Sequence, residues 1–193
     1  EATERALNDA EVYFGHGTDN AWDEAVFLVL GACGMPLDTQ QDELQKELTD
    51  TQLLQVKSWL EKRIQQRLPL PYLTGETWFA GIPFGVSEDV IIPRSPIAEL
   101  IGNHFSPFIN QLPKTALDLC CGSGCIGLAC ALAFPESRVI LADISTQALA
   151  VAEINIKRFG LEERVSVRHS DLYQQITENF DLIVSNPPYV PQD

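Results

Sequence analysis

Ala116-Leu117-Asp118-Leu119-Cys120-Cys121-Gly122-Ser123-Gly124 (residues 116–124) is the stretch that decides the fold. An apolar run of strand length leads directly into two glycines, and an apolar helical stretch, 125–133, follows them. Glycines at such a turn let the backbone pass close to a ligand, and the start of the next helix favours a carboxylate. We therefore predict a strand, a ligand-binding turn and a helix.

After this unit, strand patterns and helix patterns continue to alternate along the chain. Strands are expected over 139–142, 165–168 and 180–184, and a helix capped by Ser145 should run to Phe159, with Gly160 ending it. Alternating strands and helices predict an α/β fold with a parallel sheet and right-handed crossovers.

The chain before this unit has a different pattern. Residues 1–70 are expected to form a helical substrate-recognition domain, 71–112 a linker with a β-hairpin and a helix, and 113–193 the ligand-binding domain. The expected elements are helices over 4–14 and 22–32 (capped by Asp19 or Asn20), a helix with a Thr49/Gln52 capping box and an apolar face of Leu53, Val56, Leu60, Ile64 and Leu68, a hairpin over 77–86, and a helix over 96–105.

Composition narrows the possible partners. The 193 residues are 45% hydrophobic, which allows a sizeable core, and no apolar run reaches the roughly 18 residues of a membrane span. The net charge is −14 without a cluster of Lys or Arg, so we expect no membrane association and no direct nucleic-acid binding. A basic protein or a small molecule is the expected partner.

The cysteines predict a reducing, cytoplasmic location. Their number is odd and four of them lie within eleven residues, which is a poor disulfide framework. A zinc or iron–sulfur site is the alternative to small apolar packing residues, and we favour packing and predict no metal. The five residues are Cys33, Cys120, Cys121, Cys125 and Cys130.

The first two strand ends predict a nucleoside-containing ligand. Gly122, Gly124 and Gly127 match G-x-G-x-x-G, so a dinucleotide site is one interpretation and a tight turn is another. Asp143, nineteen residues after Gly124, can accept from both ribose hydroxyls, or can merely flank the next helix. Asp118 suits the ammonium or sugar of a ligand better than a pyrophosphate.

The other two strand ends add an adenine site and an amide site. Asp171 can accept from an adenine amino group, although an Asp after a strand is most often a turn residue. Asn186-Pro187-Pro188-Tyr189 is more specific, because the prolines stiffen the loop and leave its carbonyls free. The side-chain carbonyl of Asn186 and the backbone carbonyl of Pro187 can together accept both hydrogens of a planar –NH2 group.

Taken in order, these motifs resemble the class I, Rossmann-like S-adenosylmethionine methyltransferases. A narrower resemblance, to the bacterial protein-glutamine N5-methyltransferases, covers nearly the whole chain and is carried by Pro71-Tyr72-Leu73-Thr74-Gly75, Phe79-Ala80-Gly81-Ile82-Pro83-Phe84 and Ile92-Pro93-Arg94-Ser95-Pro96-Ile97-Ala98-Glu99. It implies S-adenosyl-L-methionine as cofactor, with Asp118, Cys120, Cys121, Gly122, Ser123, Gly124, Asp143, Asp171 and Asn186 around it. It implies that Asn186, Pro187, Pro188 and Tyr189 hold the substrate glutamine, with Asn186, Pro187 and Tyr189 at the reaction.

Two departures indicate a branch of that family. The branch acting on peptide release factors has a glycine at position 120 and a proline at position 95, where this chain has Cys120 and Ser95. Both departures, Cys120 and Ser95, resemble a second branch, which modifies a glutamine of the third protein of the large ribosomal subunit. Residues 15–20 and 22–24 resemble that branch as well. Arg94 and Glu99 are expected at the opening of the substrate site. An equal alternative is that these two side chains simply pair with each other.

The resemblance also implies seven strands, whereas four are found. We expect the remaining strands to lie beyond 180–184, so that this chain is a C-terminally shortened piece whose last strand has an unpaired edge. The rival functions are an amino-methyltransferase of adenine or cytosine in nucleic acid, a nucleotide-dependent oxidoreductase, and a binding-only protein.

Overall fold

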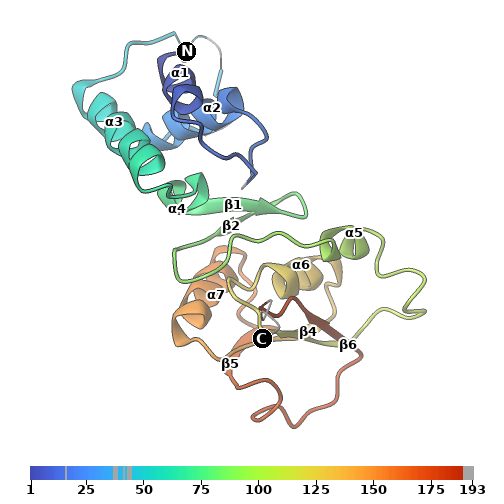
Figure 1. Ribbon diagram of the computed structural model, residues 1–193. Coiled ribbons are helices and arrows are strands. Elements are labelled where there is room, and N and C mark those ends of the chain that lie inside the picture. The colour runs from blue at the N-terminus through green and yellow to red at the C-terminus, as the bar shows by residue number, and fades with distance from the viewer. Residues whose placement is uncertain (16, 37–38, 41, 43–44, 189–193) are drawn as a thin grey trace. The chain divides into compact units, whose positions relative to one another are not determined.

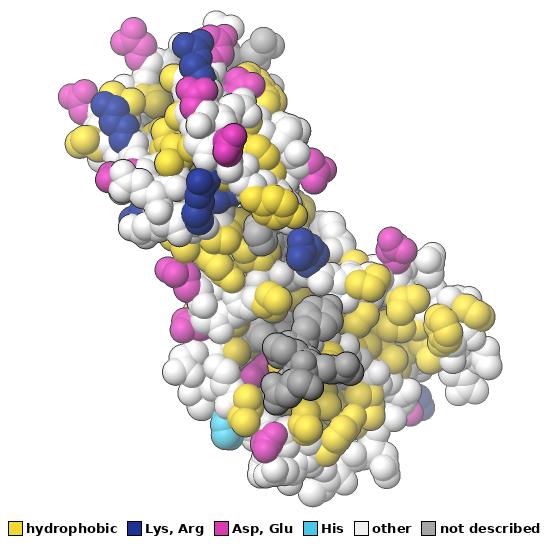
Figure 2. Space-filling model, viewed as in Figure 1, with side chains coloured by type: hydrophobic (Ala, Val, Ile, Leu, Met, Phe, Trp, Pro, Cys, Tyr) yellow, Lys and Arg dark blue, Asp and Glu magenta, His cyan; other side chains and the backbone are white. Residues whose placement is uncertain are grey.

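The computed structural model describes residues 1–15, 17–36, 39–40, 42 and 45–188. The chain forms two compact units, 1–75 and 76–193, and each is described here by itself (Figure 1). On the face shown in Figure 2, the Lys and Arg side chains lie in separate places among other side chains. Among the described residues, no helix has both the length and the apolar character needed to cross a bilayer.

The first unit is helical, as predicted. Asn20 caps its second helix by accepting the backbone N–H of Asp23 at 2.9 Å. Thr49 and Gln52 form the expected capping box. The helices are α1 (Ala2–Asp9), α2 (Ala21–Ala32), α3 (Asp50–Gln65) and α4 (Leu70–Thr74).

Three expectations for this unit were wrong. Helix α1 ends at Asp9 instead of reaching Phe14, because the chain turns at Glu11, whose φ is 48°. Leu53 is exposed, so the apolar face of α3 does not begin there. Leu68 lies beyond the end of α3 at Gln65.

Helix α4 was not predicted as a helix. Its Pro71 lies in the first turn, where a missing N–H costs nothing, and Gly75 ends the helix with a φ of 72°. A proline near a helix start is therefore compatible with the helix.

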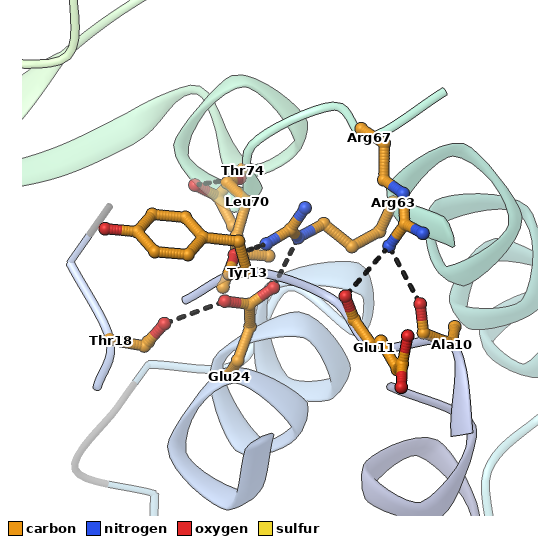
Figure 3. A network of polar contacts seen from close by, with 9 residues as sticks. All are labelled: Ala10, Glu11, Tyr13, Thr18, Glu24, Arg63, Arg67, Leu70 and Thr74. Carbon is orange, nitrogen blue, oxygen red and sulfur yellow. Dashed lines mark hydrogen bonds and ion pairs between the residues drawn. The ribbon is translucent and has the colours of Figure 1, made fainter. Parts of the chain in front are cut away.

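A buried ion pair joins the helices of the first unit (Figure 3). The Nε of Arg63 on α3 donates to the carboxylate of Glu24 on α2, and both side chains are almost completely buried. The Nη2 of Arg63 also donates to the backbone carbonyl of Tyr13 at 2.7 Å, and the hydroxyl of Thr18 donates to Glu24 at 2.8 Å. Helices α2 and α3 and the connection between α1 and α2 are thus held by one satisfied polar network.

The second unit contains the predicted α/β architecture. It opens with an antiparallel hairpin and a short helix, and its main sheet has the strand order β5-β4-β3-β6, with every pair parallel. The elements are β1 (Glu76–Phe79), β2 (Ile82–Gly85), α5 (Ile97–Gly102), β3 (Thr115–Leu119), α6 (Cys125–Ala133), β4 (Arg138–Asp143), α7 (Thr146–Arg158), β5 (Val165–His169) and β6 (Leu182–Ser185).

Both faces of the sheet are covered by apolar groups. Helices α6 and α7 lie on one face (Figure 1), where they enclose the larger core. On the other face, Leu117 and Leu119 pack with Ile176 and Phe180, which belong to the segment between β5 and β6.

Two predicted boundaries in this unit were wrong. Phe180 and Asp181 precede β6, because Phe180 packs across the sheet and the carboxylate of Asp181 accepts the backbone N–H groups of Lys114 and Thr115 at 2.8 and 3.0 Å. Helix α5 ends at Gly102 instead of Phe105, since the backbone of His104 and Phe105 turns into the left-handed region.

The ion pair in the first unit should be costly to break from one side. We expect Arg63→Met to lower the free energy of unfolding by about 3–5 kcal/mol, because Glu24 would remain buried without its partner. The double variant Glu24→Gln, Arg63→Met should regain part of this loss. Urea denaturation checks both, with Arg67→Met, at an exposed arginine, as the control. A double variant as unstable as the sum of its single variants would contradict the interpretation.

Candidate ligand and substrate site

The site lies where the winding of the sheet reverses. The chain proceeds from β3 to β4 and β5 on one side, and then returns to place β6 on the other side of β3. Leu119 is the register partner of Ser185, whose hydroxyl donates to the Leu119 carbonyl at 2.6 Å. Asn186 therefore follows β6 next to the turn that follows β3, at the position where open α/β sheets bind ligands.

The turn after β3, residues 120–124, is called the glycine loop. Cys120, Gly122 and Gly124 all have a left-handed backbone, with φ values of 61°, 54° and 78°. A Cβ on Gly122 would meet nothing within 4 Å, whereas one on Gly124 would lie 2.8 Å from a methyl of Leu141. Gly122 therefore leaves the backbone open to a ligand, and Gly124 allows close packing.

Cys120 occupies the position where the release-factor branch has glycine. Its positive φ explains the glycine, because a residue with a Cβ is strained there by about 1–2 kcal/mol. Its half-buried thiol is part of the pocket wall described below. Burial and the neighbouring Asp143 carboxylate raise the pKa of the Cys120 thiol, so it is a neutral group at this position.

Asp143 holds the glycine loop in place. Its carboxylate accepts the backbone N–H of Gly122 and that of Ser145, each at 2.9 Å. Each carboxylate oxygen has two acceptor positions, so Asp143 keeps capacity for the hydroxyls of a ribose. Its half-buried side chain is consistent with the predicted role.

Asp118 lies beneath the loop. Its side chain is fully buried, one oxygen accepts the backbone N–H of Gly127 at 2.7 Å, and the other oxygen has no hydrogen-bond partner. Burial raises the pKa of Asp118 to about 7, because it disfavours the charged form. Asp118 thus supports the start of α6, and its predicted contact with a ligand stays a prediction.

One small pocket, of about 30 Å³, brings the glycine loop and Asn186 together. Arg94 and Ser95 of the connecting segment also line it, so residues from three predicted motifs converge. Its lining consists of Phe79, Ile91, Pro93, Arg94, Ser95, Cys120, Cys121, Gly122, Ser123, Cys125, Ile126 and Asn186.

Other predicted site residues lie outside this pocket lining. Asp171 is exposed after β5, and its carboxylate accepts from the side chain of Gln174 at 2.9 Å. Pro187 and Pro188 are exposed next to Asn186. Tyr189 lies outside the described residues, so its predicted role remains a prediction.

Asn155 was not predicted as a site residue. This side chain of α7 is completely buried and bonds to both the hairpin and the glycine loop. A polar residue among apolar neighbours on a helix was the available signal, because a buried amide must find partners.

Comparison with known proteins supports the family resemblance. Residues 101–193 match the family model "Methyltransferase small domain". The chain is 49% identical over 182 residues to the ribosomal protein uL3 glutamine methyltransferase of Francisella tularensis subsp. tularensis (strain SCHU S4 / Schu 4), covering 93% of this chain and 58% of that protein. It is 44% identical over 186 residues to the protein of the same name from Neisseria gonorrhoeae (strain ATCC 700825 / FA 1090), covering 95% and 62%.

The chain therefore spans about three fifths of the length of these curated relatives. Among solved structures, the ribosomal protein L11 methylase from Lactobacillus delbrueckii subsp. bulgaricus aligns with a TM-score of 0.40 and 26% identity, over 46% of this chain and 45% of that chain. The predicted fold, a class I methyltransferase sheet, and the predicted resemblance to the uL3 branch are confirmed.

The two glycines at 122 and 127 should respond differently to alanine. A Cβ on Gly127 would lie 2.2 Å from a methyl of Leu141 and 2.8 Å from the Cβ of Asp118, so helix α6 must move. We expect Gly127→Ala to cost about 3 kcal/mol or more of unfolding free energy, and Gly122→Ala about 1 kcal/mol from backbone strain alone. Thermal and urea unfolding measure both; equal losses would contradict the packing argument.

Asp118 should make stability depend on pH. Its pKa is about 7 in the folded protein and near 3.8 when unfolded, so between these values the folded state holds a proton that the unfolded state has lost. The unfolding free energy should therefore fall as the pH rises through this interval, by at most about 1.4 kcal/mol per pH unit, and level off above pH 7. Asp118→Asn should lose this component of the slope. Urea titrations at several pH values test it, and an unchanged slope in the variant would refute it.

Proposed function

We propose that the protein containing this chain uses S-adenosylmethionine to methylate the side-chain nitrogen of a glutamine in ribosomal protein uL3. One observation carries the proposal: Asn186 and the glycine loop line the same pocket at the switch point of the sheet. The identity of 49% and 44% to two uL3 glutamine methyltransferases supports the choice of substrate.

The described residues fit the cofactor. Gly122 leaves its backbone open, and Asp143 at the end of the neighbouring strand has acceptor capacity for ribose hydroxyls. Cys120, Cys121 and Ser123 line the pocket on the side of the loop. Asp171 is assigned to the adenine end. The bound cofactor supplies a methyl group on a positively charged sulfur.

The residues after β6 are suited to activate the glutamine amide nitrogen that accepts the methyl group. An amide nitrogen is a poor nucleophile because its lone pair is delocalised into the carbonyl group. The Asn186 side-chain oxygen and the Pro187 carbonyl accept both N–H bonds of the glutamine amide, which orients the nitrogen and favours its pyramidal form. The nitrogen loses a proton as it becomes positively charged, so no strong base is required. Pro188 stiffens the loop, and Tyr189, which lies outside the described residues, is assigned to the substrate amide.

Charge favours a basic protein as the partner. The net charge of −14 attracts a basic ribosomal protein over long distances and repels nucleic acid. Arg94 at the pocket is assigned to the substrate side. The five free cysteines agree with a cytoplasmic location.

Asn186→Ala should lower kcat for methyl transfer about a hundredfold or more, because one of the two acceptors that orient the amide is lost. Asn179→Ala, at an exposed asparagine of the preceding segment, is the matched control and should retain activity. Transfer of labelled methyl groups to purified uL3 measures both variants. Wild-type turnover by Asn186→Ala would remove the proposed mechanism.

The substrate is tested in the same assay. The protein that contains this chain is incubated separately with uL3, a peptide release factor, and RNA or DNA. We expect label on a glutamine of uL3. Label confined to the release factor would place the protein in the other branch, and label confined to nucleic acid would refute a protein substrate.

A further inference from the structure

Asn155 is a buried polar group that the proposed reaction does not use. It lies on α7, and its amide makes three hydrogen bonds to backbone groups of the second unit. Its oxygen accepts the N–H of Gly85 at 2.7 Å, and its nitrogen donates to the carbonyls of Gly85 and Ser123, each at 2.9 Å. The same side chain therefore bonds to strand β2 and to the glycine loop.

One of these partners, Ser123, lines the pocket, and the other, Gly85, ends strand β2 of the hairpin whose Phe79 lines the same pocket. The lining includes Phe79 of the hairpin, Ile91 and Pro93 of the segment after it, and residues of the glycine loop. Asn155 is outside the pocket lining. A side chain that bonds to both segments and is not part of the lining suits a group that fixes their separation without touching a ligand.

The chemistry of the three bonds requires a carboxamide. Gly85 presents both a donor and an acceptor, and Ser123 presents a second acceptor, so the partner needs one oxygen and two N–H groups. Asparagine supplies this set from a short side chain. Aspartate would keep the acceptor for Gly85 and lose both donors.

The hairpin has other attachments to α7 and to its C-cap residue, Phe159. The rings of Phe84 and Phe159 pack edge to face with centroids 5.2 Å apart, and Arg158 forms an ion pair with Glu76. Both of these contacts reach the hairpin, and neither includes the glycine loop. Asn155 differs from them by joining the hairpin to the loop.

We propose that Asn155 is a positioning residue that holds the hairpin and the glycine loop at the separation required to bind S-adenosylmethionine. This inference rests on the proposed function for the identity of the ligand. Loss of the amide donors leaves the hairpin packed on α7 and releases the loop, so the affinity for the cofactor falls while the fold persists.

Asn155→Asp is the informative variant, Asn155→Leu removes all three bonds, and Arg158→Gln is the matched control that loses a hairpin contact only. Circular dichroism first establishes that each variant is folded. Calorimetry gives the Kd for S-adenosylmethionine, and hydrogen exchange of cofactor-free protein is followed in peptides covering 76–86 and 119–126. We expect Asn155→Asp to raise Kd about tenfold or more and to speed exchange at 119–126 about tenfold, while Gly85 stays protected.

Arg158→Gln should affect exchange at 76–86 alone and leave Kd within about twofold of wild type, because its ion pair is exposed. The proposal is overturned if Asn155→Asp leaves Kd and loop exchange unchanged, or if Arg158→Gln reproduces both effects. Wild-type protein that binds no S-adenosylmethionine would count against the proposed function. The exchange comparison would still decide whether Asn155 positions the loop.

Discussion

The close approach of helix α6 to strands β3 and β4 is the constraint on which the site depends. At Gly127 the helix is so near the sheet that an added Cβ would overlap both Leu141 and Asp118. The backbone N–H of Gly127 donates to the buried Asp118 carboxyl, which fixes the helix to β3. Because helix α6 lies so close to the sheet, the chain must turn sharply between β3 and α6. It does so with three residues of positive φ, Cys120, Gly122 and Gly124.

Polar groups hold that turn from several sides. The carboxylate of Asp143 accepts the backbone N–H of Gly122, and the side-chain nitrogen of Asn155 donates to the backbone carbonyl of Ser123. Such a loop is already in place before a ligand arrives, so little conformational entropy is lost on binding. One oxygen of the buried Asp118 carboxyl beneath this turn has no hydrogen-bond partner in the described part of the protein.

Local pattern was sufficient where neighbouring residues alone determine the structure. The bounds of Cys125–Ala133 and the Ser145 and Thr49 caps follow from adjacent residues, and all three were predicted. Two further features were missed because contacts distant in sequence determine them. Asp181 leaves the strand because it binds β3, sixty-six residues earlier at Thr115, and Asn155 bonds to Gly85 seventy residues before it. The convergence of Asn186 with the glycine loop was predictable, because parallel strands end at the same edge.

The recognition of an acceptor group and the recognition of a macromolecule are separate problems in this chain. In the proposed mechanism, two oxygens after β6 select a planar –NH2 group, which glutamine, adenine and cytosine all possess. The choice among them must come from outside that corner. A net charge of −14 disfavours a polyphosphate backbone, and a flipped base would require contacts to phosphates that the acidic protein is poorly equipped to make. The glutamine of a basic protein that we propose as substrate satisfies both requirements, because its amide fits the same pair of acceptors and its surroundings carry the complementary charge.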